Sequence, residues 1–525
     1  MPKAMRSYLL PSLCTLLTAV CAGATDAGAQ CAALHTFTGE AEEDNFGGSV
    51  SGAGDVDDDG YADLIVGAWG SDAGGVRAGR AYVYSGQTGA LLYTFTGEAA
   101  DDAFGHSVSD AGDVNNDGHA DVIVGAFGNS AGGPYAGRAY VYSGQTGELL
   151  MVFTGESSYD QFGSSVSGAG DVDDDGYDDL IVGAQLNGAG GYVAGRAYVY
   201  SGRTGLLLWT FTGEEAGDQL GTSVSGVGDV DDDGHADLIV GAPHNDLVAN
   251  EAGQVYVFSG KTGLLLHSIT GERQADLFGS SVSNAGDVDN DGYEDIILVA
   301  GYDDQEGRVL RRAYVYSGDR GELLWTFTGE AVGDVLGASV SGAGDLDRDG
   351  FADLLVGARG NSAAGYAAEH AYVYSGRTGR RLLTYTGEAP EDWFGASVSG
   401  CGDVNGDGVD EVIVGAWGND AGGTEAGRAY VLSLYSFGGA GDMPNCPCEC
   451  HTDPQCDGVC NVLDVVISVG VAFRGLEAPN DQECSVVRTD ADCDGDTDVF
   501  DVVRFVNVAF RNQPMESNFC DPWAP

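Results

Sequence analysis

The chain contains very little positive charge. Its 525 residues include 81 aspartates and glutamates but only 23 lysines and arginines, which gives a formal net charge of −58. A chain with this much negative charge repels nucleic acids and anionic lipid surfaces, so neither is expected as a partner. Divalent cations and an extracellular setting suit this charge. The hydrophobic content of 43% is too high for a disordered chain.

Long apolar runs are also missing. Beyond the N-terminus no segment reaches the ~18 uninterrupted apolar residues of a spanning helix, so no membrane span is expected. At the N-terminus, Lys3 and Arg6 precede an apolar run over 8–22 and small residues up to Ala29. This order predicts a secretory signal peptide over 1–29 and a secreted, extracellular or cell-surface protein. A retained membrane anchor and lipidation at Cys21 are the alternatives.

Cysteine is nearly absent from the middle of the chain. Of the 12 cysteines, eight lie between Cys446 and Cys520. In an exported protein this cluster predicts disulfide bonds, whose pairing the sequence leaves open. The alternative is a zinc site in Cys446-Pro-Cys448-Glu-Cys450-His451.

A period of 58 residues organises most of the chain. The sequence Gly-Asp-Val-Asp-Asp-Asp-Gly recurs with small changes, and its first aspartate stands at positions 55, 113, 171, 229, 287, 345 and 403. Turn signals and residue alternation predict four strands in the first repeat, at about 49–54, 64–68, 80–85 and 91–96. No helical stripe separates the repeats, which excludes a β-α-β architecture. The repeats therefore predict an all-β fold, a seven-bladed β-propeller with four-stranded blades, over residues 30–436.

The two ends of the repeat array predict how the ring closes. A segment typical of a fourth strand, 34–40, precedes the first complete repeat, and the seventh repeat stops after its third strand at 429–432. We expect the N-terminal segment to complete the seventh blade, because this protects edges that a linear array would expose. A linear solenoid would have no use for this offset.

Each repeat carries an acidic loop of the form Asp-x-Asp/Asn-x-Asp-Gly-x-x-Asp/Glu. In the first loop, four aspartates within nine residues offer carboxylates, and Tyr61 offers its backbone carbonyl. Oxygen ligands at alternate positions suit Ca²⁺, which accepts ~6–8 oxygens in a flexible geometry. The alternative is a solvated acidic turn. Crowded carboxylates repel one another without a counter-ion, which favours calcium.

The predicted ligands occupy the same five positions in every loop, which predicts about seven calcium ions in the propeller. Asparagine replaces a carboxylate in two loops, and a glutamate closes the last. The predicted ligands are Asp55, Asp57, Asp59, Tyr61, Asp63, Asp113, Asn115, Asp117, His119, Asp121, Asp171, Asp173, Asp175, Tyr177, Asp179, Asp229, Asp231, Asp233, His235, Asp237, Asp287, Asp289, Asp291, Tyr293, Asp295, Asp345, Asp347, Asp349, Phe351, Asp353, Asp403, Asn405, Asp407, Val409 and Glu411.

The units resemble FG-GAP repeats, the blades of the integrin alpha-chain head. The Phe-Gly half of the motif stands at Phe46-Gly47, Phe104-Gly105, Phe162-Gly163, Phe278-Gly279 and Phe394-Gly395, with Leu220-Gly221 and Leu336-Gly337 as variants. The Gly-Ala-Pro half is complete only at 241–243, and the fifth repeat departs furthest with Val299-Ala300-Gly301. Over residues 34–435 the resemblance implies a calcium-binding adhesion propeller. The unbroken spacing leaves no inserted ligand-binding domain, so a true integrin subunit is not expected.

A second calcium module is predicted after a Gly/Pro/Cys-rich linker at 437–451. Two twelve-residue loops have the ligand spacing of an EF-hand. Their predicted ligands are Asp453, Gln455, Asp457, Val459, Asn461 and Asp464 in the first loop, and Asp490, Asp492, Asp494, Asp496, Asp498 and Asp501 in the second. Helix-like segments follow at 464–474 and 501–511. We expect two more calcium ions in a small, cysteine-rich α-helical domain over 452–525.

These paired loops resemble a type I dockerin, the module that docks onto cohesin scaffolds. The resemblance implies a cohesin-like scaffold as a partner. Val462-Leu463 and Val499-Phe500 stand where dockerins often present hydroxyl residues, and cysteines lie in both loops. An anchoring or stabilising domain without a cohesin partner is the alternative.

No catalytic group stands out, and an enzyme is not expected. Ser130 lies in a match to the nucleophile-elbow pattern, but the equivalent loops at 70–74 and 418–422 have aspartate in its place. The carboxylate pairs fall almost entirely within the predicted calcium loops, so no glycosidase pair can be singled out.

These features together predict a secreted, calcium-binding, non-catalytic adhesion module that recognises a protein or glycan ligand on one propeller face. The ligand is expected at the variable loops near 70–79, 128–137, 186–195, 244–252, 302–311, 360–369 and 418–427. The dockerin-like tail would attach the module to a scaffold or cell surface. The alternatives are an accessory or hydrolytic part of an extracellular polysaccharide-degrading assembly and a purely structural surface-layer protein.

Overall fold

A computed structural model describes residues 33–304, 308–329, 335–359 and 369–434 of the chain. These residues form seven sheets of four strands each. Among them, no helix is long and apolar enough to cross a bilayer. The predicted signal peptide, linker, cysteine cluster and dockerin-like domain lie outside the described residues, so those predictions stay untested.

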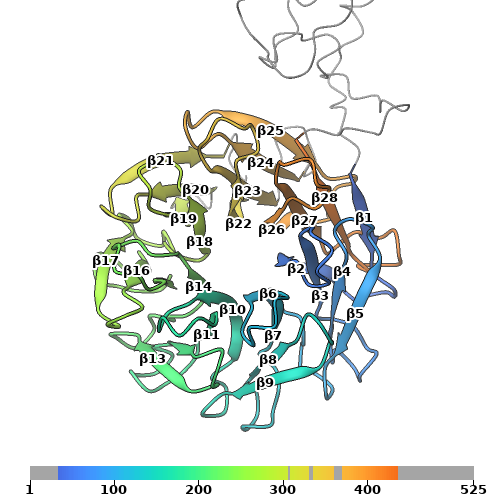
Figure 1. The fold of residues 1–525 in the computed structure, drawn as a ribbon. Helices are drawn as coiled ribbons and strands as arrows, with labels where there is room; N and C mark the ends of the chain where they lie inside the picture. The colour runs from blue at the N-terminus through green and yellow to red at the C-terminus, as the bar shows by residue number, and fades with distance from the viewer. Residues whose placement is uncertain (1–32, 305–307, 330–334, 360–368, 435–525) are drawn as a thin grey trace, which may run out of the picture. The chain divides into compact units, whose positions relative to one another are not determined.

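The sheets are the blades of a propeller (Figure 1). In the first six blades the strands follow chain order from the axis to the rim. The first blade contains β2 (Phe46–Gly54), β3 (Asp63–Ala68), β4 (Arg80–Tyr84) and β5 (Leu91–Thr96). Neighbouring strands within it are antiparallel. The predicted seven-bladed all-β propeller is therefore confirmed.

The other blades repeat this order. The second to fourth contain β6 (Ser107–Gly112), β7 (Asp121–Ala126), β8 (Arg138–Tyr142), β9 (Leu149–Thr154), β10 (Phe162–Gly170), β11 (Asp179–Ala184), β12 (Arg196–Tyr200), β13 (Leu207–Thr212), β14 (Ser223–Gly226), β15 (Leu238–Ala242), β16 (Gln254–Phe258) and β17 (Leu265–Thr270). The fifth and sixth contain β18 (Val282–Gly286), β19 (Asp295–Asp304), β20 (Arg308–Tyr316), β21 (Leu323–Thr328), β22 (Val335–Gly344), β23 (Asp353–Arg359), β24 (His370–Tyr374) and β25 (Arg381–Thr386).

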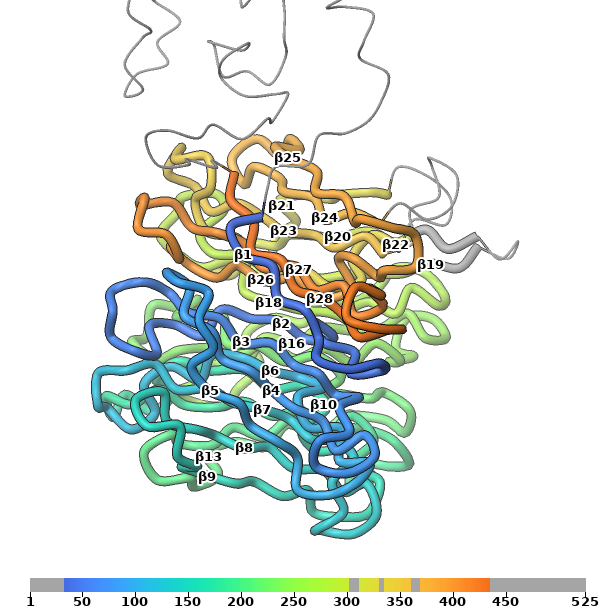
Figure 2. Tube along the Cα trace, turned by 90° about the vertical axis from the view of Figure 1, so that its right-hand side faces the viewer, coloured from blue at the N-terminus to red at the C-terminus, as the bar shows by residue number. Residues whose placement is uncertain are grey.

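The seventh blade joins the two ends of the repeat array. It contains β26 (Phe394–Gly402), β27 (Glu411–Ala416), β28 (Arg428–Leu432) and, at its rim, β1 (His35–Thr38). In Figure 2 the blue β1 lies beside the orange β28, and the two strands pair antiparallel with Phe37 opposite Ala429. The ring of Phe37 is buried and stacks on Tyr84 of the first blade, with 4.0 Å between ring centroids. The predicted ring closure is confirmed.

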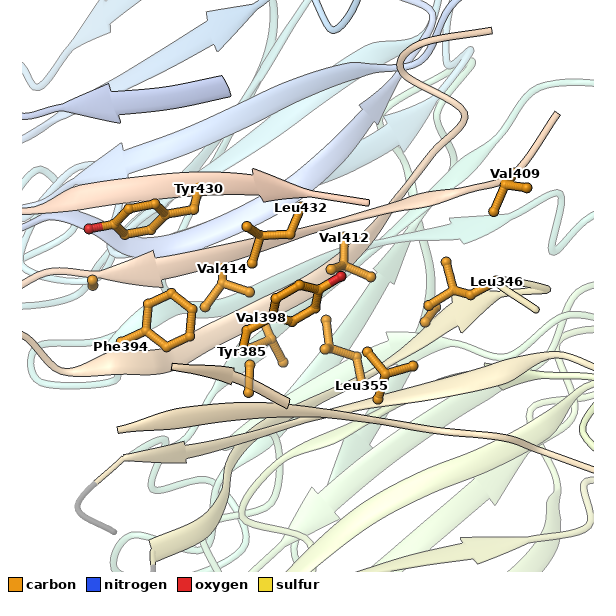
Figure 3. Close-up of a cluster of buried hydrophobic side chains, with 14 residues drawn as sticks. Leu346, Leu355, Tyr385, Phe394, Val398, Val409, Val412, Val414, Tyr430 and Leu432 are labelled. Atoms are coloured by element: carbon orange, nitrogen blue, oxygen red, sulfur yellow. The ribbon is translucent and has the colours of Figure 1, made fainter. Parts of the chain in front are cut away.

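The hydrophobic core lies between neighbouring blades. Along β4, Ala81 and Val83 pack against the second blade, whereas Tyr82 packs against the seventh. The side chains of β3 are buried on both faces, which explains why this strand is a continuous apolar run. Figure 3 shows one such interface, where Leu355 from the sixth blade faces Val398 and Val412 from the seventh.

Close contacts between glycines explain the two halves of the FG-GAP motif. A Cβ on Gly67 of the first repeat would lie 1.9 Å from the carbonyl oxygen of Gly105 in the second repeat. Gly105 itself has φ +84, which favours glycine. The Gly-Ala half of one repeat therefore meets the Phe-Gly half of the next. In the fifth repeat Val299 takes the place of this glycine and packs against Gly337.

Polar contacts also join neighbouring blades. On the inner strands, the N–H of Val108 donates to Ser49 Oγ of the preceding blade at 3.1 Å, and five other junctions have the same bond. These Ser-Val-Ser segments line a cavity of about 190 Å³ on the axis. Nearer the rim, Arg80 pairs with Glu40 of the preceding blade at 2.8 Å, and the pairs Arg138–Glu98, Arg196–Glu156 and Arg428–Glu388 repeat this contact.

Phe37→Ala should weaken ring closure, because β1 pairs with β28 at only four positions and Phe37 is its buried side chain. We expect the free energy of unfolding to fall by about 3 kcal/mol, a usual cost of truncating a buried aromatic ring. Denaturant unfolding in calcium-containing buffer measures this, and Thr36→Ala, at an exposed position of the same strand, is the control. Equal losses in both variants would contradict the role given to the Phe37 ring.

Candidate metal centre

All seven acidic loops lie at the same end of the blades. Each loop connects the first strand of a blade to the second, as 55–62 connects β2 to β3. Because the strands are antiparallel, the turn between the third and fourth strands lies at this end too. We call it the calcium end. The loops between β3 and β4, and the connections from one blade to the next, lie at the opposite end.

Hydrogen bonds of the backbone shape each acidic loop. In the first loop the Asp55 carboxylate accepts the N–H groups of Asp59 and Gly60, at 3.1 and 2.9 Å. The carboxylate of Asp59 accepts the N–H of Tyr61 at 3.0 Å. Asp58, between them, has a left-handed φ of 57°. These bonds curl the loop and bring its side chains toward one another.

The last carboxylate of each loop is fully buried. In the first loop, Asp63 accepts the N–H of Val56 from its own loop and the N–H of Gly86 from the β4–β5 turn, both at 2.9 Å. The same two bonds recur at Asp121, Asp179, Asp237, Asp295 and Asp353. In the seventh loop, Glu411 accepts the N–H of Val404. In the first six blades this last carboxylate therefore fixes the acidic loop to the turn between the third and fourth strands.

Burial strongly perturbs the acidity of these last carboxyl groups. Because burial disfavours the charged form, the pKa of Asp63 rises to about 6 and that of Asp179 to about 7, and the nearby aspartates act in the same direction. The backbone N–H bonds oppose the rise. Burial and the neighbouring aspartates also raise the pKa of Asp57, at the third loop position. A cation is the natural group to offset this crowding.

Five loops gather three carboxylates whose oxygens lie within 4.8 Å of one another. These groups are Asp55, Asp57 and Asp63; Asp171, Asp173 and Asp179; Asp229, Asp231 and Asp237; Asp287, Asp289 and Asp291; and Asp345, Asp347 and Asp353. In the second and seventh loops asparagine stands at the third position. Asn115 Oδ1 and Asp289 Oδ1 are buried and accept no hydrogen bond. Unused acceptors within a set of hard oxygen donors fit calcium.

The predicted ligand positions have different surroundings. The first and third positions come together in these groups, joined by the ninth in four loops and by the fifth position, Asp291, in the other. At the seventh position, where a carbonyl ligand is predicted, the side chain reaches the preceding blade. A ring nitrogen of His119 lies 3.0 Å from the carbonyl oxygen of Val56. That these residues bind a metal stays a prediction, and the predicted dockerin-like ligands lie outside the described residues.

Two features of the site were not predicted. The first is the bond from the Gly86 N–H to the buried Asp63, which makes the turn part of the site. The second is the left-handed fourth loop position, which is aspartate or asparagine in five loops, Gly406 in the seventh and Arg348 in the sixth. Aspartate, asparagine and glycine tolerate this conformation best, so their recurrence was a usable signal.

Six of the seven repeats match a known repeat family. The sequence model of the FG-GAP repeat matches residues 46–84, 104–142, 162–200, 220–258, 336–374 and 394–432. These six segments leave out the fifth repeat, the one with Val299 in place of glycine. A solved structure described as the Dos1 propeller aligns with 77% of this chain and 84% of its own, at 13% identity and a TM-score of 0.42.

Integrin alpha chains are among the similar proteins. Integrin alpha-5 of Xenopus laevis is 32% identical over 217 residues, which cover 38% of this chain and 20% of the relative. Integrin alpha-V of Gallus gallus is 29% identical over 241 residues, which cover 43% and 23%. The chain thus matches about a fifth of the length of these curated relatives. These similarities support an FG-GAP, integrin-like β-propeller.

Removal of calcium should destabilise the propeller. The crowded carboxylates would lose their counter-ion, and binding energy specific to the native state would be withdrawn. We expect excess EDTA to lower Tm by roughly 10 °C or more. Calorimetry measures this, with restoration by calcium and weaker restoration by magnesium as controls. An unchanged Tm in EDTA would contradict the calcium sites.

The metal-free protein should lose stability as pH rises. The pKa of Asp179 is about 7 in the metal-free native state, and unfolding returns it toward 3.8. The native state therefore binds more protons between about pH 4 and pH 7, so its free energy of unfolding falls as pH rises through this window.

We expect the Tm of calcium-depleted protein to be higher at about pH 5 than at about pH 7.5, and calcium to raise Tm more at the higher pH. High salt is the control, because it screens repulsion between exposed charges more than the effect of buried carboxyls. A Tm that rises with pH in metal-free protein would refute the prediction.

Proposed function

We propose that this FG-GAP propeller is a secreted, calcium-binding and non-catalytic adhesion module that recognises a protein or glycan ligand. The observation that carries the proposal is the difference between the two ends of the blades. Seven similar acidic loops occupy the calcium end, and loops of variable sequence occupy the opposite end. The similarity to integrin alpha chains supports an adhesion or ligand-binding role.

The variable end combines a fixed backbone with changing side chains. At the junction of the first and second blades, Arg77 and Asp101 both have left-handed φ values, 50° and 65°, and form an ion pair. At the next junction Tyr135 and Tyr159, with φ of 53° and 70°, take the same places. Non-glycine residues with positive φ cost energy and cluster at functional sites. A repeated scaffold with variable side chains is well suited to recognition.

Tyrosines make the second and third blades the strongest candidate for ligand contact. The rings of Tyr135 and Tyr159 stack with 6.0 Å between centroids and 12° between planes. Tyr159 is 61% exposed, and Tyr192 of the third blade is 86% exposed. Exposed tyrosines supply large contact areas at low entropic cost and are frequent in binding sites. We place the ligand on these variable loops.

The rest of the proposal concerns the segments of the chain outside the propeller. The signal sequence over 1–29 supports export, and the dockerin-like pattern over 452–525 supports attachment to a scaffold or cell surface. The nine predicted calcium ions, seven in the propeller and two in the tail, would stiffen both modules. A role in a polysaccharide-degrading assembly has no support beyond the dockerin resemblance.

The proposal predicts that binding depends on the variable end. The full chain, loaded with calcium, is screened against glycans and extracellular proteins. Tyr135→Ala combined with Tyr159→Ala and Tyr192→Ala should weaken binding of a hit about tenfold or more. Leu206→Ala with Leu264→Ala is the control, because these side chains are 66% and 67% exposed at the calcium end. A greater loss in the leucine variant, with binding retained in the tyrosine variant, would place the ligand at the calcium end and contradict the proposal.

A further inference from the structure

The acidic loop of the fifth blade already holds a cationic side chain. Arg320 lies in the turn between β20 and β21, at the calcium end. Its Nη2 lies 2.6 Å from Asp289 Oδ2, and its Nη1 lies 2.7 Å from Asp291 Oδ2. Both aspartates belong to the three-carboxylate group of this loop. One guanidinium therefore bridges two predicted calcium ligands.

Three other blades have a basic side chain in the equivalent turn, one position before that of Arg320, and none of them makes this bridge. In the third blade, Arg203 Nη1 is 3.8 Å from Asp175 Oδ2, and the guanidinium lies over the ring of Tyr177. In the fourth blade, Lys261 donates to the backbone oxygen of Asp233 and stays 3.9 Å from its carboxylate. In the sixth blade, the guanidinium of Arg377 lies over the ring of Phe351. The first two turns have glutamine at this position. The fifth loop therefore differs in its electrostatics from the first four loops and the sixth.

A local change of sequence explains the reach of Arg320. The aligned position is threonine in this turn of the first four blades and the sixth, as Thr88, whose hydroxyl donates to Ser85 Oγ within the turn. In the fifth blade this position is Arg320, and its N–H still donates to Ser317 Oγ at 3.2 Å. The turn thus keeps its backbone form while the longer side chain extends to the acidic loop.

We propose that Arg320 is a tethered cation that holds the fifth loop in shape without calcium and lowers its calcium affinity below that of the first four loops and the sixth. Asp289 Oδ1 stays buried without a partner, so the loop retains an oxygen for an ion. An entering Ca²⁺, however, meets a fixed positive charge and must compete for the other oxygens. The fifth site therefore fills after the sites of those five loops. This inference rests on the proposed calcium binding.

Paired subtraction isolates the fifth site in the full chain. Equilibrium dialysis measures bound calcium at set free concentrations. Asp287→Asn removes a predicted ligand of the fifth loop. The wild-type isotherm minus the Asp287→Asn isotherm is therefore the calcium-binding curve of the fifth loop with Arg320 present. The same subtraction in an Arg320→Gln background gives the binding curve of the fifth loop without the arginine. We expect the half-saturating calcium concentration of the fifth loop to fall about tenfold in the absence of Arg320.

Stability supplies a second readout. Arg320→Gln should lower Tm in EDTA but not in saturating calcium, because only the metal-free loop needs the guanidinium. Arg203→Gln is the matched control and should change both quantities much less, since its guanidinium approaches a single carboxylate, at 3.8 Å, and bridges none.

The outcomes separate two failures. An unchanged half-saturation in Arg320→Gln, with calcium still bound, overturns the role of Arg320 and leaves calcium binding intact. The absence of bound calcium in the wild type overturns the proposed calcium binding itself. If Arg320→Gln does not fold, Arg320→Lys decides, because lysine keeps the charge but not the planar fork that spans two carboxylates. An intermediate shift supports the proposal, and a wild-type isotherm overturns it.

Discussion

A buried carboxylate at the start of the second strand of each blade is the group on which the rest of the architecture depends. Asp63 joins the acidic loop, through Val56, to the β4–β5 turn, through Gly86. The residues that follow it form the strand buried on both faces. A charge at this depth is costly unless hydrogen bonds and a counter-ion oppose the cost. Two N–H groups supply part of that compensation and join loop, strand and turn into one unit, and the proposed calcium ion would supply the rest.

The repeated loops also connect to one another around the ring. The N–H of Ala120 in the second blade donates to the carbonyl oxygen of Asp55 in the first, at 3.0 Å, and His119 reaches the same loop. The proposed ion in one loop would therefore also stabilise the next loop. The opposite end does not need the same side chain in every repeat. Its left-handed backbone positions recur with unrelated side chains, such as Arg77 and Tyr135. Stability at one end leaves sequence at the other free for recognition.

Most of the fold could be predicted from local sequence patterns, whereas contacts between residues distant in the sequence could not. The alternation of Ala81, Tyr82 and Val83 indicated a strand, and the offset ends of the array predicted that β1 completes the seventh blade. Loop spacing predicted that the first and third positions approach each other. The sequence could not show that Asp63 bonds a turn 23 residues away, because that contact depends on how the blade folds. The reach of Arg320 likewise depends on where the turn lies relative to the loop.

The fifth repeat shows which features make a blade. Val299 replaces the closely packed glycine and Arg320 replaces the turn threonine, and the FG-GAP sequence model leaves this repeat unmatched. Its four strands nevertheless pair as in the other blades. In a ring, each blade is held by interfaces on both faces, so one altered junction need not unfold it. The fifth blade keeps the strand alternation and the buried Asp295 with both of its backbone N–H bonds. These features, together with Phe278-Gly279, are what the fifth blade shares with most of the other blades, and the glycine that Val299 replaces is not required for the four strands to pair.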